Sequence, residues 1–287
     1  MSAATSLPSS AGPHPPGWEA SLELGFERRD GVNTLVRRRH RGPLRVQRPF
    51  HPDQDGPCQV IVLHPPGGIV GGDRLCVDIR VGEQAEALVT TPGATKFYRS
   101  LGATAHQVTR LRVEPGGLLE WLPQETLVFD GVRARIETRV DLAAGARFLG
   151  CEITGLGLPA SGRPFERGQC QTHWQIWRDD QPIWIDRARL CGGDERLKAA
   201  WGLADHSVTG SLVFTGGEAS ALAAVRACLA EERFDGRVAA TLLGEVLICR
   251  ALANSTRHVL DLFSAVRNRL RCDVLGAPAS PPRIWAT

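Results

Sequence analysis

Five carboxylates of this 287-residue chain lie within or beside apolar, strand-like segments. They are Asp73, Glu120, Glu125, Glu152 and Asp186. A buried carboxylate needs an ion-pair partner, a metal ion or a proton. For any single position a salt bridge is the simplest interpretation, because arginines are plentiful and Arg187 directly follows Asp186. The other chemistries open to such residues are general-base catalysis at Glu125 or Glu152 and transient coordination of a divalent cation.

The usual signatures of enzymes and nucleotide-binding proteins are missing from the sequence. There is no G-x-S-x-G and no H-E-x-x-H. The glycine-rich segment 64–73 (HPPGGIVGGD) matches neither G-x-x-x-x-G-K-[ST] nor G-x-G-x-x-G, the two common spacings of phosphate-binding loops. No helix is predicted after it to bind an anion. We interpret it as a tight turn between two strands in which Asp73 accepts backbone hydrogen bonds. The eight cysteines form no C-x-x-C and are expected to be small buried hydrophobes.

The overall composition argues against nucleic-acid and membrane partners. The chain has 34 basic and 31 acidic residues, a net charge of +3, and no run of 18 apolar residues. Residues 37–41 (RRRHR) are interpreted as a solvated strand end, because no aromatic residues are interleaved with them. Residues 1–17 lack signal-peptide features and are expected to be a disordered lead-in. We expect residues 18–287 to form one β-rich domain with a helical C-terminal part, in the cytoplasm.

Strand patterns dominate the first two thirds of the chain. Period-two alternation or short apolar runs bounded by turn residues predict strands over 18–26, 32–36, 60–63, 75–81, 87–91, 107–113, 118–122, 132–140, 146–154, 172–177 and 183–190. The sequence is therefore predicted to be mostly β.

A faint repeat indicates how these strands are arranged. Aligning Gln84, Gly116 and Gly145 places similar turn-and-strand segments 32 and 29 residues apart. A step near thirty predicts stacked layers of strands, as in a β-solenoid. In this alignment Thr91 and Glu152 each lie seven residues after their aligned turn residue, and Glu125 lies close to the equivalent position of its own repeat.

The last third of the chain is predicted to contain two helices. Residues 218–230 are alanine-rich, 238–248 are predicted to form a strand, and Asn254 and Ser255 can cap a helix that runs to Leu270. The apolar face of that helix predicts that Arg257, Arg267, Arg269 and Arg271 point outwards. Together with Trp285 near the C-terminus, Arg257, Arg267 and Arg271 are candidate partner-binding residues.

Three long segments carry a family resemblance. HPPGGIVGGD, TTPGATKFYRS and LEWLPQET, with GPLRVQRPF before them and PPRIW after them, resemble the urease accessory protein UreD (UreH) family from residue 18 to the end. The resemblance implies a β-rich stack of sheets with a small helical part. It also implies a cytoplasmic, non-enzymatic scaffold in the GTP-dependent machinery that inserts nickel into urease.

The resemblance also implies partners and site residues. The expected partners are the F accessory protein directly, the G GTPase in a larger complex and the urease apoprotein, with nickel supplied by the E metallochaperone. No tightly bound cofactor is expected, only a transient nickel ion. The resemblance implies an internal nickel path with Asp73, Glu152 and Asp186 as metal positions, lined by Thr90 and Thr91. Glu125, which the repeat places near Glu152, is added to that lining.

Two departures from the family pattern bear on the path. Leu158 stands where relatives commonly have an arginine, and Asp186 stands where a glutamate is commoner. Two other classes of function stay open on the residues alone. One is a β-rich hydrolase or transferase with Glu125 or Glu152 as general base, and the other is a plain protein-binding module.

Overall fold

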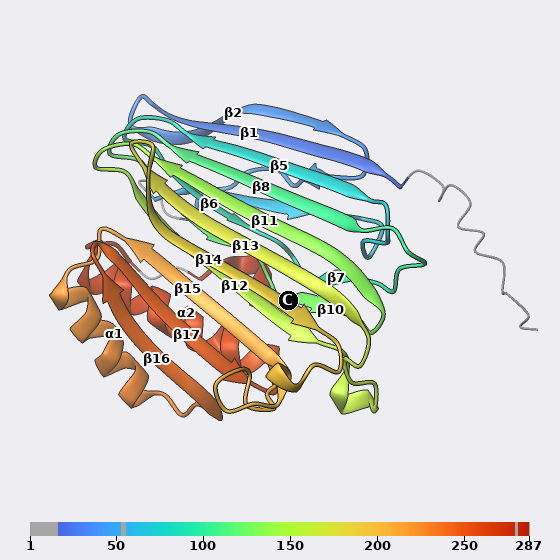
Figure 1. Cartoon of the computed structure of the whole chain (residues 1–287). Coiled ribbons are helices and arrows are strands. Elements are labelled where there is room, and N and C mark those ends of the chain that lie inside the picture. Colours follow the sequence, from blue (N-terminus) through green and yellow to red (C-terminus); the bar gives the residue numbers. More distant parts are fainter. Residues whose placement is uncertain (1–16, 53–55, 279–280, 287) are drawn as a thin grey trace, which may run out of the picture.

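Two β-sheets packed face to face, with two helices on the outer side of the second sheet, make up the molecule (Figure 1). The computed structural model describes residues 17–52, 56–278 and 281–286. The predicted disordered lead-in, apart from Gly17, lies outside the described residues. The prediction of a mostly β, layered fold is confirmed.

The first sheet has seven strands in the order β14-β13-β11-β8-β5-β1-β2. Their bounds are β1 (Glu19–Arg29), β2 (Val32–Arg41), β5 (Arg74–Val81), β8 (Ala105–Val113), β11 (Val132–Leu142), β13 (Gly168–Arg178) and β14 (Gln181–Cys191). Neighbouring strands from β1 to β13 are parallel, while β2 and β14 close the two edges as antiparallel strands. The arginine run 37–41 lies in edge strand β2 and is largely exposed, as predicted.

The second sheet is built around the order β16-β17-β15-β12-β9-β6-β4-β3, with β10 paired to β12 and β7 paired to β10. Its bounds are β3 (Arg45–Val46), β4 (Cys58–Leu63), β6 (Glu86–Thr90), β7 (Thr95–Phe97), β9 (Leu118–Leu122), β10 (Thr126–Val128), β12 (Arg147–Leu156), β15 (Val208–Thr215), β16 (Gly236–Leu243) and β17 (Val246–Ala253). Strands β4, β6, β9 and β12 are parallel.

The chain alternates between the two sheets, and the repeat in the sequence is the pitch of that coil. Glu86 pairs with Leu118 in the second sheet, and Leu118 pairs with Arg147, which are steps of 32 and 29 residues. The first sheet has the same two steps, from Val81 to Val113 and from Val113 to Leu142. The aligned turn residues Gln84, Gly116 and Gly145 all have positive φ. The solenoid register predicted from the sequence is confirmed.

The alternation within strands builds two cores. In β5, Leu75, Val77, Ile79 and Val81 are buried between the sheets, and the residues between them face outwards. A second core fills the space between the other face of the second sheet and helices α1 (Ala219–Glu231) and α2 (Thr256–Asp273). Strand β9 (LLEWL) contributes to both cores and is buried throughout.

The C-terminal third matches the predicted helices but not the predicted strand. Ser255 caps α2 by accepting a hydrogen bond from the backbone N–H of His258 at 3.3 Å. The segment 238–248, predicted as one strand, belongs to the hairpin of β16 and β17. Gly244 has positive φ and turns the chain between two aliphatic runs, so the prediction missed this break. In the part of the chain that the structure describes, no helix has the length and apolar character to cross a membrane.

Candidate functional site

A cavity of about 340 Å³, lined by both polar and apolar residues, lies between the two sheets. Residues of the segments 64–69 and 91–96, which carry two of the sequence motifs, lie along it. The polar side chains among its lining residues are His64, Thr91, Thr95, Lys96, Gln107, Thr109, Gln124, Thr126, Thr138, Glu152, Thr154 and Thr172. Most of them are neutral groups with an oxygen or nitrogen that can accept a hydrogen bond or bind a cation.

The strand register explains why hydroxyl groups gather there. In β11 Thr138 is the one polar residue among apolar inward positions, and it pairs directly with Thr109, an inward residue of β8. Thr172 of β13 lies beside Ile136 of β11 in the same ladder and also lines the cavity. Strands β8, β11 and β13 therefore each add a hydroxyl to the same region of the inner face.

Glu152 of β12 is the one carboxylate among the described residues that line the cavity. Thr138 of the opposite sheet donates a hydrogen bond from Oγ1 to Glu152 Oε1 at 2.7 Å. Burial raises the pKa of Glu152 to about 7, the bond from Thr138 opposes this shift, and the nearby charge of Asp186 adds to it. The side chain is therefore poised between its charged and neutral forms near neutral pH.

Asp186 and Glu125 lie outside the lining of the cavity. Asp186 of β14 forms an ion pair with Arg250 of β17 at 3.0 Å, which ties the two sheets together. Glu125 accepts a long hydrogen bond from Thr256 Oγ1, 3.4 Å away at the start of α2. Of the two, Asp186 still acts on the cavity, through its charge on Glu152.

Asp73 organises the glycine-rich turn. Its carboxylate accepts hydrogen bonds from the backbone N–H groups of Trp18 at 2.8 Å and Val70 at 2.9 Å, and it is buried. The predicted role of Asp73 in binding backbone donors is confirmed. It is also absent from the residues that line the cavity.

Adjacent threonines of the TTPG motif face opposite sides of the second sheet. Thr91 lines the cavity, where its Oγ1 accepts a hydrogen bond from the backbone N–H of Gln124 at 2.9 Å. Thr90 is buried on the other side, where it donates to the carbonyl oxygen of Leu122 at 2.6 Å and accepts from Trp285 Nε1 at 2.9 Å. The expectation that both line one path conflicts with this geometry, because successive strand residues point to opposite faces.

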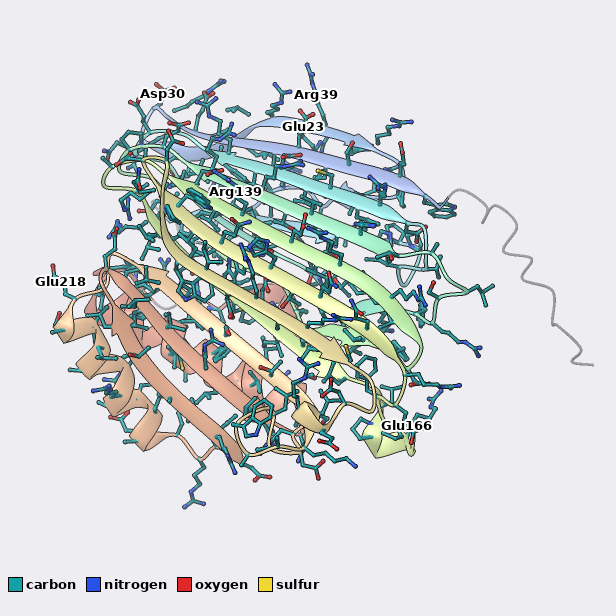
Figure 2. The ribbon with its side chains drawn as sticks, in the orientation of Figure 1. Glu23, Asp30, Arg39, Arg139, Glu166 and Glu218 are labelled. Atoms are coloured by element: carbon teal, nitrogen blue, oxygen red, sulfur yellow. The ribbon has the colours of Figure 1, made fainter. Side chains whose placement is uncertain are left out.

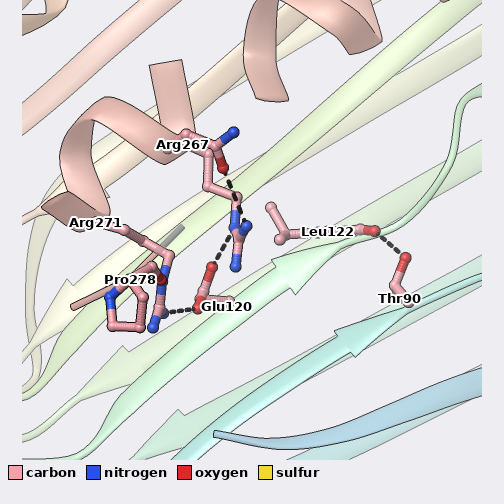
Figure 3. A network of polar contacts seen from close by, with 7 residues as sticks. Thr90, Glu120, Leu122, Arg267, Arg271 and Pro278 are labelled. Atoms are coloured by element: carbon pink, nitrogen blue, oxygen red, sulfur yellow. Dashed lines mark hydrogen bonds and ion pairs between the residues drawn. The ribbon is translucent and has the colours of Figure 1, made fainter. Parts of the chain in front are cut away.

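A buried ion cluster joins β9 to α2 (Figure 3). Glu120 is fully buried, and one of its carboxylate oxygens accepts a bond from Arg267 Nε at 2.6 Å. The other oxygen accepts a short bond from Arg271 Nη1, and Arg271 Nε donates to the carbonyl oxygen of Pro278 at 2.9 Å. Glu120 thus has the salt bridges that its apolar sequence context requires.

The prediction that Arg267 and Arg271 point outwards is therefore wrong. Both are about 2% exposed, because Glu120 supplies a carboxylate within an otherwise apolar layer. Arg257 is exposed as predicted and pairs with Asp261 one turn along the helix. Trp285 is partly buried against the second core, so the C-terminal segment is attached to the body of the protein.

A comparison with protein families decides the identity of this fold. The model described as "UreD urease accessory protein" matches residues 19–286. The chain belongs to the UreD urease accessory protein family. It is 46% identical to a urease accessory protein UreD of Dechloromonas aromatica (strain RCB) over 284 residues, 98% of this chain and 99% of the relative. It is 41% identical to a UreD of Nostoc punctiforme over 269 residues, 94% of this chain and 96% of the relative.

In this UreD-family chain Leu158, which was expected to stand where relatives have an arginine, lies beside Arg163. Leu158 forms an isolated bridge with Arg163, with backbone N–H to oxygen distances of 2.6 Å and 3.1 Å. Arg163 is exposed. The turn between them places the backbone of Arg163 next to that of Leu158.

Sequence reasoning missed several residues of this UreD-family cavity. Thr109, Thr138 and Thr172 were not singled out, although each occupies an inward position of a strand whose other inward residues are mostly apolar. A threonine at an inward position is the signal that could have identified them. Within the described ranges, no group of three or more His, Cys, Asp or Glu side chains is placed to hold a metal ion.

Proposed function

We propose that the chain acts in urease maturation as a non-enzymatic scaffold whose inter-sheet cavity passes a nickel ion towards urease. The observation that carries the proposal is the position of Glu152, the one carboxylate among the described residues that line a cavity whose other polar groups are hydroxyls, amides, His64 and the basic Lys96. Oxygen ligands of this kind bind a borderline divalent ion less tenaciously than thiolates do. Nickel is the cargo in this proposal and not a resident cofactor.

The energetics favour passage over storage. A dication 4 Å from one carboxylate gains roughly 8 kcal/mol at an effective dielectric constant of 20, before its desolvation is subtracted. A single carboxylate among mostly neutral ligands, with the basic Lys96 also in the lining, therefore gives a shallow site, from which an ion can leave as well as enter. Asp186 contributes at longer range through its negative charge, and Asp73 contributes by holding the turn beside the cavity.

The family also suggests the partners. Its name is that of a urease accessory protein, which supports assembly with other urease accessory proteins and with the urease apoprotein. We include the F accessory protein as the direct partner, the G GTPase in the larger complex and the E metallochaperone as the source of nickel. Docking through the exposed Arg257 and the C-terminal segment around Trp285 is part of the proposal.

The decisive experiment is urease activation by complexes that carry Glu152→Gln. The substitution keeps the shape and the bond from Thr138 but removes the charge that attracts the cation. We expect activation to fall by roughly tenfold or more, about 1.4 kcal/mol of lost interaction, while a pull-down recovers the same partners. Glu125→Gln is the matched control, because Glu125 contacts Thr256 outside the cavity lining, and it should change activation by less than about twofold. If partners are lost in step with activation, Glu152 is structural and the proposal fails.

One observation favours a hydrolase or transferase as the second candidate. Thr138 Oγ1 and Glu152 Oε1 are 2.7 Å apart, and the pKa of Glu152 is raised to about 7, which suits a general base next to a hydroxyl. The same variant separates the two functions. An enzyme would show saturable turnover of an ester in the isolated wild-type protein that Glu152→Gln abolishes, whereas a scaffold would show none.

A further inference from the structure

The outer face of the seven-stranded sheet carries a second, separate feature. Outward side chains alternate with the inward ones that line the cavity, and Figure 2 shows them projecting from the face on which Arg139 is labelled. Several arginines of this sheet contact carboxylates: Arg37 with Glu23 at 2.5 Å, Arg80 with Glu114 at 2.7 Å, and Arg139 with Asp141 at 2.7 Å. Paired arginines of this kind are a solvated surface and need no partner protein.

The arginine patch, defined as Arg74, Arg133, Arg135, Arg187 and Arg189, is different. All five residues are exposed, and Arg135 alone contacts a carboxylate, that of Glu137. Three of the others have neutral partners: Arg187 donates to His173 at 3.0 Å, Arg189 to Gln169 at 3.0 Å and Arg133 to the carbonyl oxygen of Gly102 at 3.4 Å. For Arg74, Arg133, Arg187 and Arg189 the described part of the chain supplies no ion pair.

The neighbouring groups leave most of this positive charge uncompensated. Burial and the charges of Arg74 and Arg135 lower the pKa of His106, and burial and Arg187 lower the pKa of His173, which favours the neutral form of both rings. In the turns at this end of the sheet, Asp130 is held by Arg167 and Asp194 by Arg196. Glu19 of β1, which is directly paired with Arg74, forms an ion pair with Arg41 at 3.7 Å. The patch therefore presents five guanidinium groups and the carboxylate of Glu137, with Glu19 at its β1 end.

The strand register arranges part of the patch in a straight row. Arg74, His106, Arg135, Gln171 and Arg189 occupy directly paired positions on five neighbouring strands. Because neighbouring strands are about 4.8 Å apart, the three arginines repeat at about 10 Å, with hydrogen-bonding side chains between them. A shallow depression of about 500 Å³ over His106, Arg133, Arg135, Gln169 and Gln171 lies along the row.

We propose that the arginine patch is a docking surface for an acidic helix of a partner protein, with carboxylates at positions i, i+7 and i+14. That spacing is about 10.5 Å along a helix and matches the row of arginines. Guanidinium groups bind carboxylates in a bidentate manner, and arginine is enriched at protein interfaces. A long polyanion such as nucleic acid fits less well, because the next rows carry Asp78, Glu137 and Asp141.

The test uses the full-length protein and a synthetic helical peptide with glutamates at i, i+7 and i+14. A second peptide has the same composition with its glutamates distributed around the helix. The row variant Arg74→Gln/Arg135→Gln/Arg189→Gln is compared with the matched variant Arg37→Gln/Arg80→Gln/Arg139→Gln from the same sheet. Fluorescence anisotropy gives the affinities at about 0.1 M salt, and circular dichroism checks that each variant is folded.

We expect the row variant to bind the patterned peptide roughly tenfold more weakly, and the matched variant to stay within about twofold of the wild type. The scattered peptide should bind more weakly than the patterned one. Equal losses in both variants, or no binding of the patterned peptide to the wild type, would overturn the proposal. Tighter binding to a DNA duplex or to phosphatidylserine vesicles than to the peptide would also overturn it, in favour of a polyanion.

Discussion

At the scale of a single residue, the protonation of Glu152 links stability to pH. Its pKa is about 7 in the folded protein and 4.5 in the unfolded reference, so the folded state binds the proton more tightly. Folding is therefore progressively disfavoured as the pH rises from about 4.5 to about 7, by about 3 kcal/mol in total. The same ionisation creates the negative charge that a passing cation requires.

We predict that Glu152→Gln stabilises the protein above pH 7 and has little effect near pH 4.5. Urea unfolding at pH 5 and pH 8 measures the difference, and the gain at pH 8 should be about 1–3 kcal/mol larger. Glu125→Gln is the control with the same chemical change at a site outside the cavity lining. A gain for Glu152→Gln that is independent of pH would show that the ionisation of this carboxyl does not oppose folding.

At the scale of an element, the attachment of α2 to the second sheet depends on Glu120. The Glu120, Arg267 and Arg271 cluster is buried and carries two positive charges against one negative charge. Removing the carboxylate leaves two guanidinium groups without their counterion in an apolar layer, which is far more costly than removing an exposed pair.

We predict that Glu120→Ala destabilises the protein by about 3–5 kcal/mol and loosens α2. Denaturant unfolding measures the loss, and hydrogen exchange locates it in residues 256–273. The control is Arg257→Ala, which removes an exposed ion pair within the same helix and should cost less than about 1 kcal/mol. A loss below 1 kcal/mol for Glu120→Ala would mean that the apolar residues of α2 hold the helix by themselves.

The helix also illustrates how far the sequence determines such details. Its cap at Ser255 and its apolar residues Val259, Phe263 and Val266 were predictable, because capping and the 3.6-residue period are local properties. The burial of Arg267 and Arg271 was not, because it depends on a carboxylate 147 and 151 residues away. The opposite placement of Thr90 and Thr91 was predictable from strand alternation but was overlooked. The cavity lining needs two sheets in register, which a single strand pattern does not specify.

At the scale of the whole molecule, the parallel coils form the most deeply enclosed part. Strand β9 is paired on both sides, by β6 and β12, and is buried on both faces. Edge strands β2 and β16 each have one paired side within their sheets and many exposed residues. The sequence predicted this layered coil because its turns recur at Gln84, Gly116 and Gly145. Which strands form the edges of the sheets could not be predicted in this way, because the edge strands β2 and β16 lie outside the repeat.

We predict that native-state hydrogen exchange is slowest in β9 and in β8 and fastest among the strands in β2 and β16. Central strands open only with the whole fold, whereas edge strands fray locally. Protection of β9 over β16 should be roughly hundredfold or more, equivalent to about 2.7 kcal/mol. Mass spectrometry of peptic fragments resolves the four strands. Equal protection in β9 and β16 would contradict a fold stabilised from its central coils.

The steps of 32 and 29 residues between paired strands have a kinetic consequence. In the central coils each strand finds its partner only after a loop of about thirty residues has closed, so these parallel pairings are expected to form more slowly than the local contacts of a helix. During synthesis the ribosome releases β4, β6, β9 and β12 in spatial order, and each can dock only on the strand made before it. Until the next coil arrives, the last strand is an unpaired edge that favours aggregation. Slow translation and early contact with a partner would therefore raise the yield of this chain more than a stabilised core would.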